Sequence, residues 1–185
     1  WIVGNEVNKR YEWNYVNISD LNAYANEYAE AVRLCYNAIK SKNANAHVNI
    51  CTDQQWDRNT REAGKYDAKD FINAFNNAII AGGNIDWGLM NHPYPVPLTW
   101  AAYWTGGAYY KNLVKHNENS PYVTMENIEV LTDYMCRPEL LNPAGQVRSI
   151  QVGAGYNTTQ GENYACAAMV LAYQQAANNQ HIDTF

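Results

Sequence analysis

The pair Asn5-Glu6 stands directly after a short apolar run, Trp1-Ile2-Val3, that Gly4 closes. The run predicts a buried strand, so the amide and the carboxylate are expected where that strand passes into a loop. Two later apolar runs, ending near 51 and 90, are followed by polar side chains in the same way. The residues expected at these three strand ends are Asn5, Glu6 and Asn8, then Asp53, Gln54, Gln55 and Trp56, then Asn91, His92 and Tyr94.

These residue types suit a neutral polyhydroxylated ligand, because amides hydrogen-bond to hydroxyl groups and aromatic rings stack on sugar faces. Each residue also has a simpler explanation: Glu6 as a solvated loop residue, Asn5 as a turn residue, Trp56 as part of the core. The prolines of His92-Pro93-Tyr94-Pro95 could serve only to set the path of a rigid loop. The recurrence of such residues at successive strand ends is what favours a site.

Helical patterns alternate with the strand patterns. Two further segments, "VRSIQVGAG" and the final "HIDTF", predict strands. The caps and buried stripes of the expected helices are Ser19-Asp20 with Leu21, Tyr24, Tyr28, Ala31, Cys35 and Ile39; Asp67 with Phe71, Phe75 and Ile79, ending at Gly82-Gly83; Thr124 with Ile128, Leu131 and Met135, ending before Pro138; and a capping box at 159–162 with Ala165, Met169, Ala172 and Ala176.

This alternation predicts an α/β fold with a parallel sheet and helices outside it, either doubly wound or a (β/α)8 barrel. The length of 185 residues with 47% hydrophobic residues is enough for one domain. In such sheets ligands bind at the carboxyl ends of the strands, where the polar residues above are expected.

Composition and motifs exclude several function classes. A formal charge of -5 without a basic cluster argues against a nucleic-acid partner, and no apolar run is long enough for a membrane helix. The four Cys and four His show no metal-ligand spacing, and no nucleotide or serine-hydrolase motif is present, so we expect no metal and no cofactor. Cys35 and Cys166 are expected as buried free thiols, and Cys51 could be a nucleophile only if a His stood beside it.

The Asn5-Glu6 pair after a strand resembles the retaining glycoside hydrolases of the large (β/α)8-barrel clan, clan A, in which an Asn-Glu pair ends the fourth strand. More narrowly, four stretches in order resemble an uncharacterised bacterial family of that clan, over nearly the whole chain: "WIVGNEVN", "DQQWDRN", "IDWGLMNHPYPVPLTW" and "YNTTQGENYACAAMVLAYQQAANNQHIDTF". The resemblance implies that residues 1–185 are one incomplete barrel domain holding strands four to seven and the start of strand eight. The missing N-terminal half of the barrel is then expected as a partner, and an oligo- or polysaccharide as the substrate.

The resemblance also implies roles for individual residues. Glu6 would be the acid/base that protonates the glycosidic oxygen, Asn5 would bind the sugar hydroxyl next to the reacting carbon, and His92 and Tyr94 would line the pocket. By analogy with bacterial polysaccharide-degrading enzymes, the protein is expected outside the cell or at its surface.

The second carboxylate that retaining hydrolysis needs is missing at its expected place. The Ser-Glu-Gln-Gly stretch of the family aligns with 152–155, which puts Gly153 at the position of the nucleophile. Three explanations remain open: a carbohydrate-binding pseudoenzyme, substitution by another carboxylate such as Glu162, or a local reading-frame error. A shift of one base in the codons for 151–156 admits Arg-Ser-Glu-Gln-Gly. As written, this chain alone is expected to be inactive.

Overall fold

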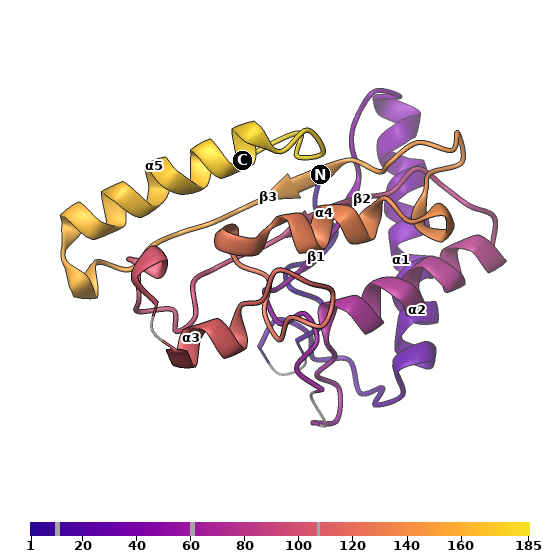
Figure 1. The fold of residues 1–185 in the computed structure, drawn as a ribbon. Helices are drawn as coiled ribbons and strands as arrows, with labels where there is room; N and C mark the ends of the chain where they lie inside the picture. The colour runs from indigo at the N-terminus through magenta and orange to yellow at the C-terminus, as the bar shows by residue number, and fades with distance from the viewer. Residues whose placement is uncertain (10–11, 60–61, 107) are drawn as a thin grey trace.

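The computed structural model describes residues 1–9, 12–59, 62–106 and 108–185. Helices and strands alternate along most of the chain (Figure 1). In order, they are α1 (Leu21–Lys42), β1 (Asn49–Thr52), α2 (Ala68–Ala81), β2 (Gly88–Asn91), α3 (Ala108–Leu113), α4 (Glu129–Met135), β3 (Ile150–Val152) and α5 (Glu162–Asn178). Short 3-10 turns cover Tyr103–Thr105, Met125–Asn127, Pro138–Leu140 and Thr158–Gln160.

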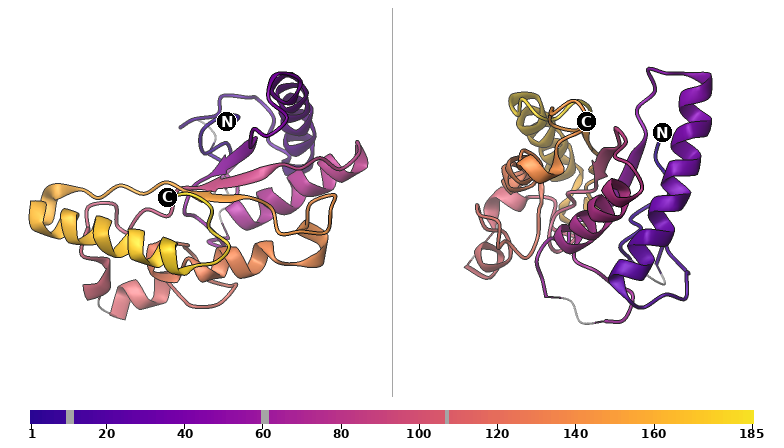
Figure 2. Two further views of the ribbon diagram at one scale, coloured as in Figure 1. Left: turned by 90° about the horizontal axis from the view of Figure 1, so that it is seen from above. Right: turned by 90° about the vertical axis from the view of Figure 1, so that its right-hand side faces the viewer.

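The three strands form a parallel sheet in the order β1-β2-β3, which confirms the predicted α/β class. Two single bridges extend the sheet in the same parallel sense, Ile2 beside Asn49 at one edge and Thr184 beside Gln151 at the other. The strand order therefore follows the chain order throughout. The helices keep that order too, because α1 and α5 lie on opposite sides of the molecule in all three views (Figures 1 and 2).

The strand register separates two faces of the sheet. Ile50, Leu89 and Ile150 form one row across the strands, and all three are fully buried in the hydrophobic core. The next row, Cys51 with Met90 and Gln151, points to the opposite face because side chains alternate along a strand. Polar residues that follow the strands, such as His92 two positions after Met90, continue this second face.

The core between α1 and α2 is largely aromatic. Tyr28 of α1 packs against Phe71 and Phe75 of α2, with ring centroids 5.7 and 5.5 Å apart. Trp87, just before β2, meets Phe75 edge to face at 5.1 Å. Full burial of one such side chain contributes about 1.5–3 kcal/mol, so this cluster fixes the helices against the strands.

Three of the predicted helix starts agree with the structure. Asp20 caps α1 and accepts a hydrogen bond of 2.8 Å from the Ala23 amide. Asp67 precedes α2, although its side chain instead accepts from the Asn59 amide, at 2.7 Å. Thr124 caps a 3-10 turn that leads into the short α4.

The predicted capping box at the start of α5 is wrong. Gly161 occupies the N-cap of α5 with φ +112°, and no side chain caps the helix there. Asn157 instead caps the preceding 3-10 turn through the Thr159 amide. The predicted stripe holds at Ala172 and Ala176, which are buried, and at Ala165, which packs partly buried against the core. Met169 is the exception: it is 40% exposed, and its neighbour Ala168 is buried instead.

The cysteines and the first residues differ from expectation as well. The four cysteines are free, but Cys166 is exposed and Cys35 only half-buried. The opening run is not a buried strand: Ile2 makes a single bridge to β1, and Trp1 is 73% exposed. In the described part of the chain, β1 is the strand with which this segment pairs. The final segment likewise contributes only the bridge at Thr184.

No helix in the described part of the chain combines the length and the apolar character that crossing a membrane requires.

Candidate functional site

A pocket of about 670 Å³ lies at the carboxyl ends of the strands. Its lining combines amides, carboxylates, one imidazole and apolar or aromatic side chains. The lining residues are Asn5, Glu6, Glu12, Trp13, Asp53, Gln54, Gln55, His92, Tyr94 and Leu98. The structure thus brings together residues from the loops that follow the first segment, β1 and β2, as the sequence predicted for this edge of the sheet.

Glu6 has an unusual backbone conformation in the first loop, the loop that follows residues 1–3. Its φ is +40°, a region that residues with a side chain rarely adopt. The following residue, Val7, donates its amide to Cys51 O at 3.0 Å, so the loop continues to follow β1. Such strain at a pocket-lining carboxylate is typical of functional sites, where the surrounding structure holds a residue in place.

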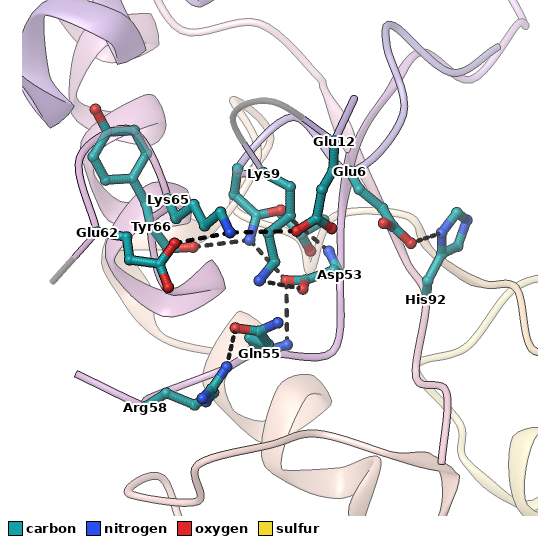
Figure 3. A network of polar contacts seen from close by, with 12 residues as sticks. Glu6, Lys9, Glu12, Asp53, Gln55, Arg58, Glu62, Lys65, Tyr66 and His92 are labelled. Atoms are coloured by element: carbon teal, nitrogen blue, oxygen red, sulfur yellow. Dashed lines mark hydrogen bonds and ion pairs between the residues drawn. The ribbon is translucent and has the colours of Figure 1, made fainter. Parts of the chain in front are cut away.

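A closed circuit of polar contacts connects Asn5 and Glu6. Glu6 Oε1 lies 2.8 Å from His92 Nδ1, and His92 Nε2 lies 3.7 Å from Cys51 Sγ. The Cys51 thiol in turn donates to Asn5 Oδ1 at 3.9 Å. Figure 3 shows the Glu6 side chain directed toward His92. The two neighbouring residues of the loop are therefore connected through side chains from β1 and from the end of β2.

The environment of His92 favours its charged form. Burial by itself lowers the pKa of His92, but hydrogen bonds to Cys51 and Glu6 outweigh burial and raise this pKa to about 10. Burial and the nearby Glu6 raise the pKa of the Tyr94 phenol. The Tyr94 ring lies 5.5 Å from the His92 ring, between centroids. At neutral pH the site therefore holds an imidazolium beside Glu6.

A second polar group, Lys9 with Asp53, lies beside Glu6 (Figure 3). Lys9 Nζ is 3.1 Å from Asp53 Oδ2, and both side chains are at least 96% buried. Asn8 Nδ2 donates to Asp53 Oδ1 at 2.8 Å. Burial raises the pKa of Asp53 to about 6, although Lys9, Asn8 and the Gln55 amide all oppose that rise. Asp53 is thus a buried ion-pair partner at the wall of the pocket.

Three of the predicted site residues are structural instead. Trp56 is fully buried, with its indole N–H donated to Glu118 O at 3.0 Å, so it cannot stack on a sugar. Asn91 is also fully buried and donates to Asp53 O at 2.9 Å. It faces away from the pocket because His92, the next residue, faces into it. The side-chain amide of Asn8 donates both its hydrogen bonds within the protein, to Asp53 and to Tyr66 O.

The pocket also contains residues that the sequence analysis did not single out. Glu12 and Trp13 come from the first loop, and Leu98 comes from the loop after β2. Trp13 is 59% exposed, which gives the pocket an accessible indole in place of Trp56. Lys9 carried no sequence signal, since its partner Asp53 is 44 positions away along the chain.

Gly153 lies next to His92 at the end of β3. A Cβ added to Gly153 would meet His92 Cδ2 at 3.2 Å and Met90 Sδ at 3.8 Å. The alignment-derived nucleophile position is therefore beside the Glu6–His92 pair. Glu162, the alternative carboxylate, is exposed at the start of α5 and does not line this pocket. Within the described residues, no three His, Cys, Asp or Glu side chains form a group suited to a metal ion.

Cys51 does have a His beside it, which was the condition for a nucleophilic role. However, Cys51 is fully buried. A substrate carbonyl or sugar carbon has no access to its sulfur, so this arrangement is not that of a working thiol nucleophile.

Fold and site together define a parallel α/β protein with a polar, aromatic-lined pocket at the carboxyl ends of its strands. The chain belongs to a family of unknown function, DUF5722, whose model matches residues 1–185. No curated protein and no solved structure matches the chain.

Proposed function

We propose that this chain carries the acid/base part of a glycosidase-like site, with Glu6 as the acid/base and an oligo- or polysaccharide as the ligand. The observation that carries the proposal is the position of Glu6, which is held at φ +40° in a pocket of about 670 Å³ among amides and aromatic rings. Gln54, Gln55 and Asn5 offer hydrogen bonds to sugar hydroxyls, and Trp13 and Tyr94 offer faces for sugar rings.

The same proposal extends to the fold. Five parallel segments follow one another in chain order, from Ile2 through β1, β2 and β3 to Thr184. A doubly wound sheet reverses its strand order at the ligand site, whereas a (β/α)8 barrel does not. The uninterrupted order therefore supports part of a barrel, with the remaining strands supplied by the rest of the barrel.

In this site Glu6 would protonate the glycosidic oxygen as the bond to the leaving group breaks, with the proton that His92 Nδ1 donates to it in the resting site, and as a carboxylate it would later take a proton from water. Retention also needs a nucleophilic carboxylate about 5 Å away. Position 153, the place for that group, carries glycine. With glycine there, we expect binding of the glycan without formation of a glycosyl-enzyme intermediate.

The first test compares the intact protein with its Glu6→Gln variant on a panel of aryl glycosides. If Glu6 is the acid/base, the variant loses most of any activity, and Glu12→Gln, a matched change in the same pocket, keeps it. Equal hydrolysis by the intact protein and by Glu6→Gln, at a rate above that of the uncatalysed reaction, would remove the proposed role. Direct sequencing of the DNA around codon 153 decides whether the protein under test carries glycine or glutamate there.

The second candidate is a carbohydrate-binding protein that does not hydrolyse its ligand. The observation that favours it is the contact between Gly153 and His92, because a Cβ at 153 would lie 3.2 Å from His92 Cδ2 and the imidazole would have to shift to make room. Calorimetric titration with oligosaccharides is the test. Binding without product, weakened by Trp13→Ala, supports this candidate, and the absence of binding to any glycan contradicts it.

A further inference from the structure

Cys51 lies beneath the pocket and contacts two of the groups that define it. Its sulfur is 3.7 Å from His92 Nε2 and 3.9 Å from Asn5 Oδ1. The residue is fully buried on β1, so these contacts come from a fixed position in the sheet. A thiol can accept one hydrogen bond and donate another, which is the pattern that this position requires.

The hydrogen atoms of the circuit can be assigned consistently. His92 as an imidazolium donates Nδ1–H to Glu6 Oε1 and Nε2–H to Cys51 Sγ. The Cys51 S–H then points to Asn5 Oδ1. Every donor in the circuit thus has an acceptor, and the imidazole ring is held at both nitrogens.

We infer that Cys51 is a positioning residue that acts through His92 and Asn5 to hold the Glu6 carboxylate in the pocket. The Cys51 side chain never contacts the ligand. It fixes the rotation of the imidazole ring, and that ring fixes Glu6. The inference refines the acid/base role proposed above, but the geometry on which it depends exists without any ligand.

The groups that face His92 come from three elements. Glu6 approaches from the first loop, Cys51 from β1, and Tyr94 from the loop that follows β2. The end of β3 contributes Gly153, which has no titratable side chain. Since Glu6 and Cys51 both accept hydrogen bonds from the charged ring, loss of either acceptor destabilises the imidazolium.

The test is a pH titration of His92 in the intact protein, monitored by NMR with isotope-labelled histidine. The signal of His92 is assigned by its absence in a His92→Gln variant. Cys51→Ala removes the acceptor at Nε2, so the pKa of His92 is expected to fall by about one pH unit or more. Cys51→Ser retains a donor and an acceptor and is expected to keep most of the raised pKa. Cys166→Ala, an exposed thiol on α5, is the control and leaves the titration unchanged.

The result that overturns the inference is a His92 titration in Cys51→Ala that matches the unchanged protein. If Cys51→Ala does not fold, the pKa of His92 is compared between Cys51→Ser and Cys51→Thr. Both variants keep a hydroxyl group, but the added methyl group of Thr displaces the ring. A lower pKa of His92 in Cys51→Thr than in Cys51→Ser supports the inference, and equal values contradict it. A merely structural cysteine would lower thermal stability without moving the His92 titration. Because no substrate is involved, this outcome is independent of whether Glu6 catalyses hydrolysis.

Discussion

Two carboxylates that line the pocket are each held by a cationic side chain. Glu6 is paired with His92, and Asp53 is paired with Lys9, so neither carboxylate is a free anion in the site. Retaining hydrolysis uses one neutral and one ionised carboxyl group instead. In the proposed site, position 153 is the place for the second carboxyl group.

We predict that Gly153→Glu in the intact protein produces hydrolysis of an aryl glycoside at a rate about tenfold or more above that of Gly153→Gln. The two side chains have nearly the same size, and both must displace the His92 ring, so only the nucleophilic carboxylate distinguishes them. Spectrophotometric release of the aryl group is the measurement. Equal rates in the two variants would show that position 153 is not the place of a nucleophile.

The buried Lys9–Asp53 pair predicts a pH-dependent stability. The pKa of Asp53 is about 6 in the folded protein and about 4 in an unfolded chain, so the folded state binds the proton more tightly. The contribution of Asp53 to the free energy of unfolding therefore falls as the pH rises from about 4 to 6, and it is level above that range.

Lys9→Met removes the cation that holds this pKa down, so the fall continues to higher pH. We expect a loss of about 3 kcal/mol near pH 8 and a clearly smaller loss near pH 5, where Asp53 is protonated. Urea unfolding across this pH range is the measurement. Lys65→Met, which removes two largely exposed ion pairs, with Glu12 and with Glu62, serves as the control and has little effect. A loss that is equal at both pH values would contradict the assignment.

At the scale of elements, local signals predicted the helix starts best where a side chain caps the backbone directly. Asp20 was predicted as the cap of α1 and makes that bond. The box at 159–162 satisfied the same rule but failed, because Gly161 reaches φ +112° and Asn157 caps the turn before it. A capping motif in the sequence makes a side-chain hydrogen bond to the helix start possible, but the backbone conformation decides whether that bond forms.

For α1 we predict that Asp20→Ala lowers the free energy of unfolding by about 1 kcal/mol, because the Ala23 amide loses its acceptor. Asp20→Asn keeps an acceptor in the same place and should retain most of the stability. Thermal unfolding followed by circular dichroism distinguishes the two variants. A similar loss in both would point to the charge of Asp20, acting on the helix dipole, rather than to the cap bond.

At the scale of the whole molecule, one buried arginine connects segments that are distant in the sequence. Arg148, just before β3, is 1% exposed and lies over the Trp87 ring, with the guanidinium carbon 4.3 Å from its centroid. It donates to carbonyl or amide oxygens of Asn84, Ile85, Trp87, Leu140 and Leu141. Burial lowers the pKa of Arg148 to about 10, which still leaves the side chain charged at neutral pH.

Arg148→Met is predicted to cost about 3 kcal/mol or more, because it leaves several buried carbonyl groups without donors. Arg148→Lys should recover little, since one ammonium group cannot replace the planar fork of donors. Arg33→Met is the matched control: Arg33 bonds to two carbonyl groups, Gly83 O and Ile79 O, and is half-buried, so we expect a loss below about 1 kcal/mol. Chemical denaturation compares all three, and a small loss in Arg148→Met would contradict the prediction.

The sequence by itself determined the alternation of strands and helices, the start of α1 and the gathering of polar residues at strand ends. These depend on periodicity and capping, which act between residues a few positions apart. Only the tertiary structure decided that His92 faces the pocket while Asn91 faces the core, that Trp56 is buried and Trp13 accessible, and that Cys51 lies beneath His92. Those outcomes depend on strand register, where a shift of one residue exchanges the two faces of a strand, and on contacts spanning 41 to 86 positions of the chain.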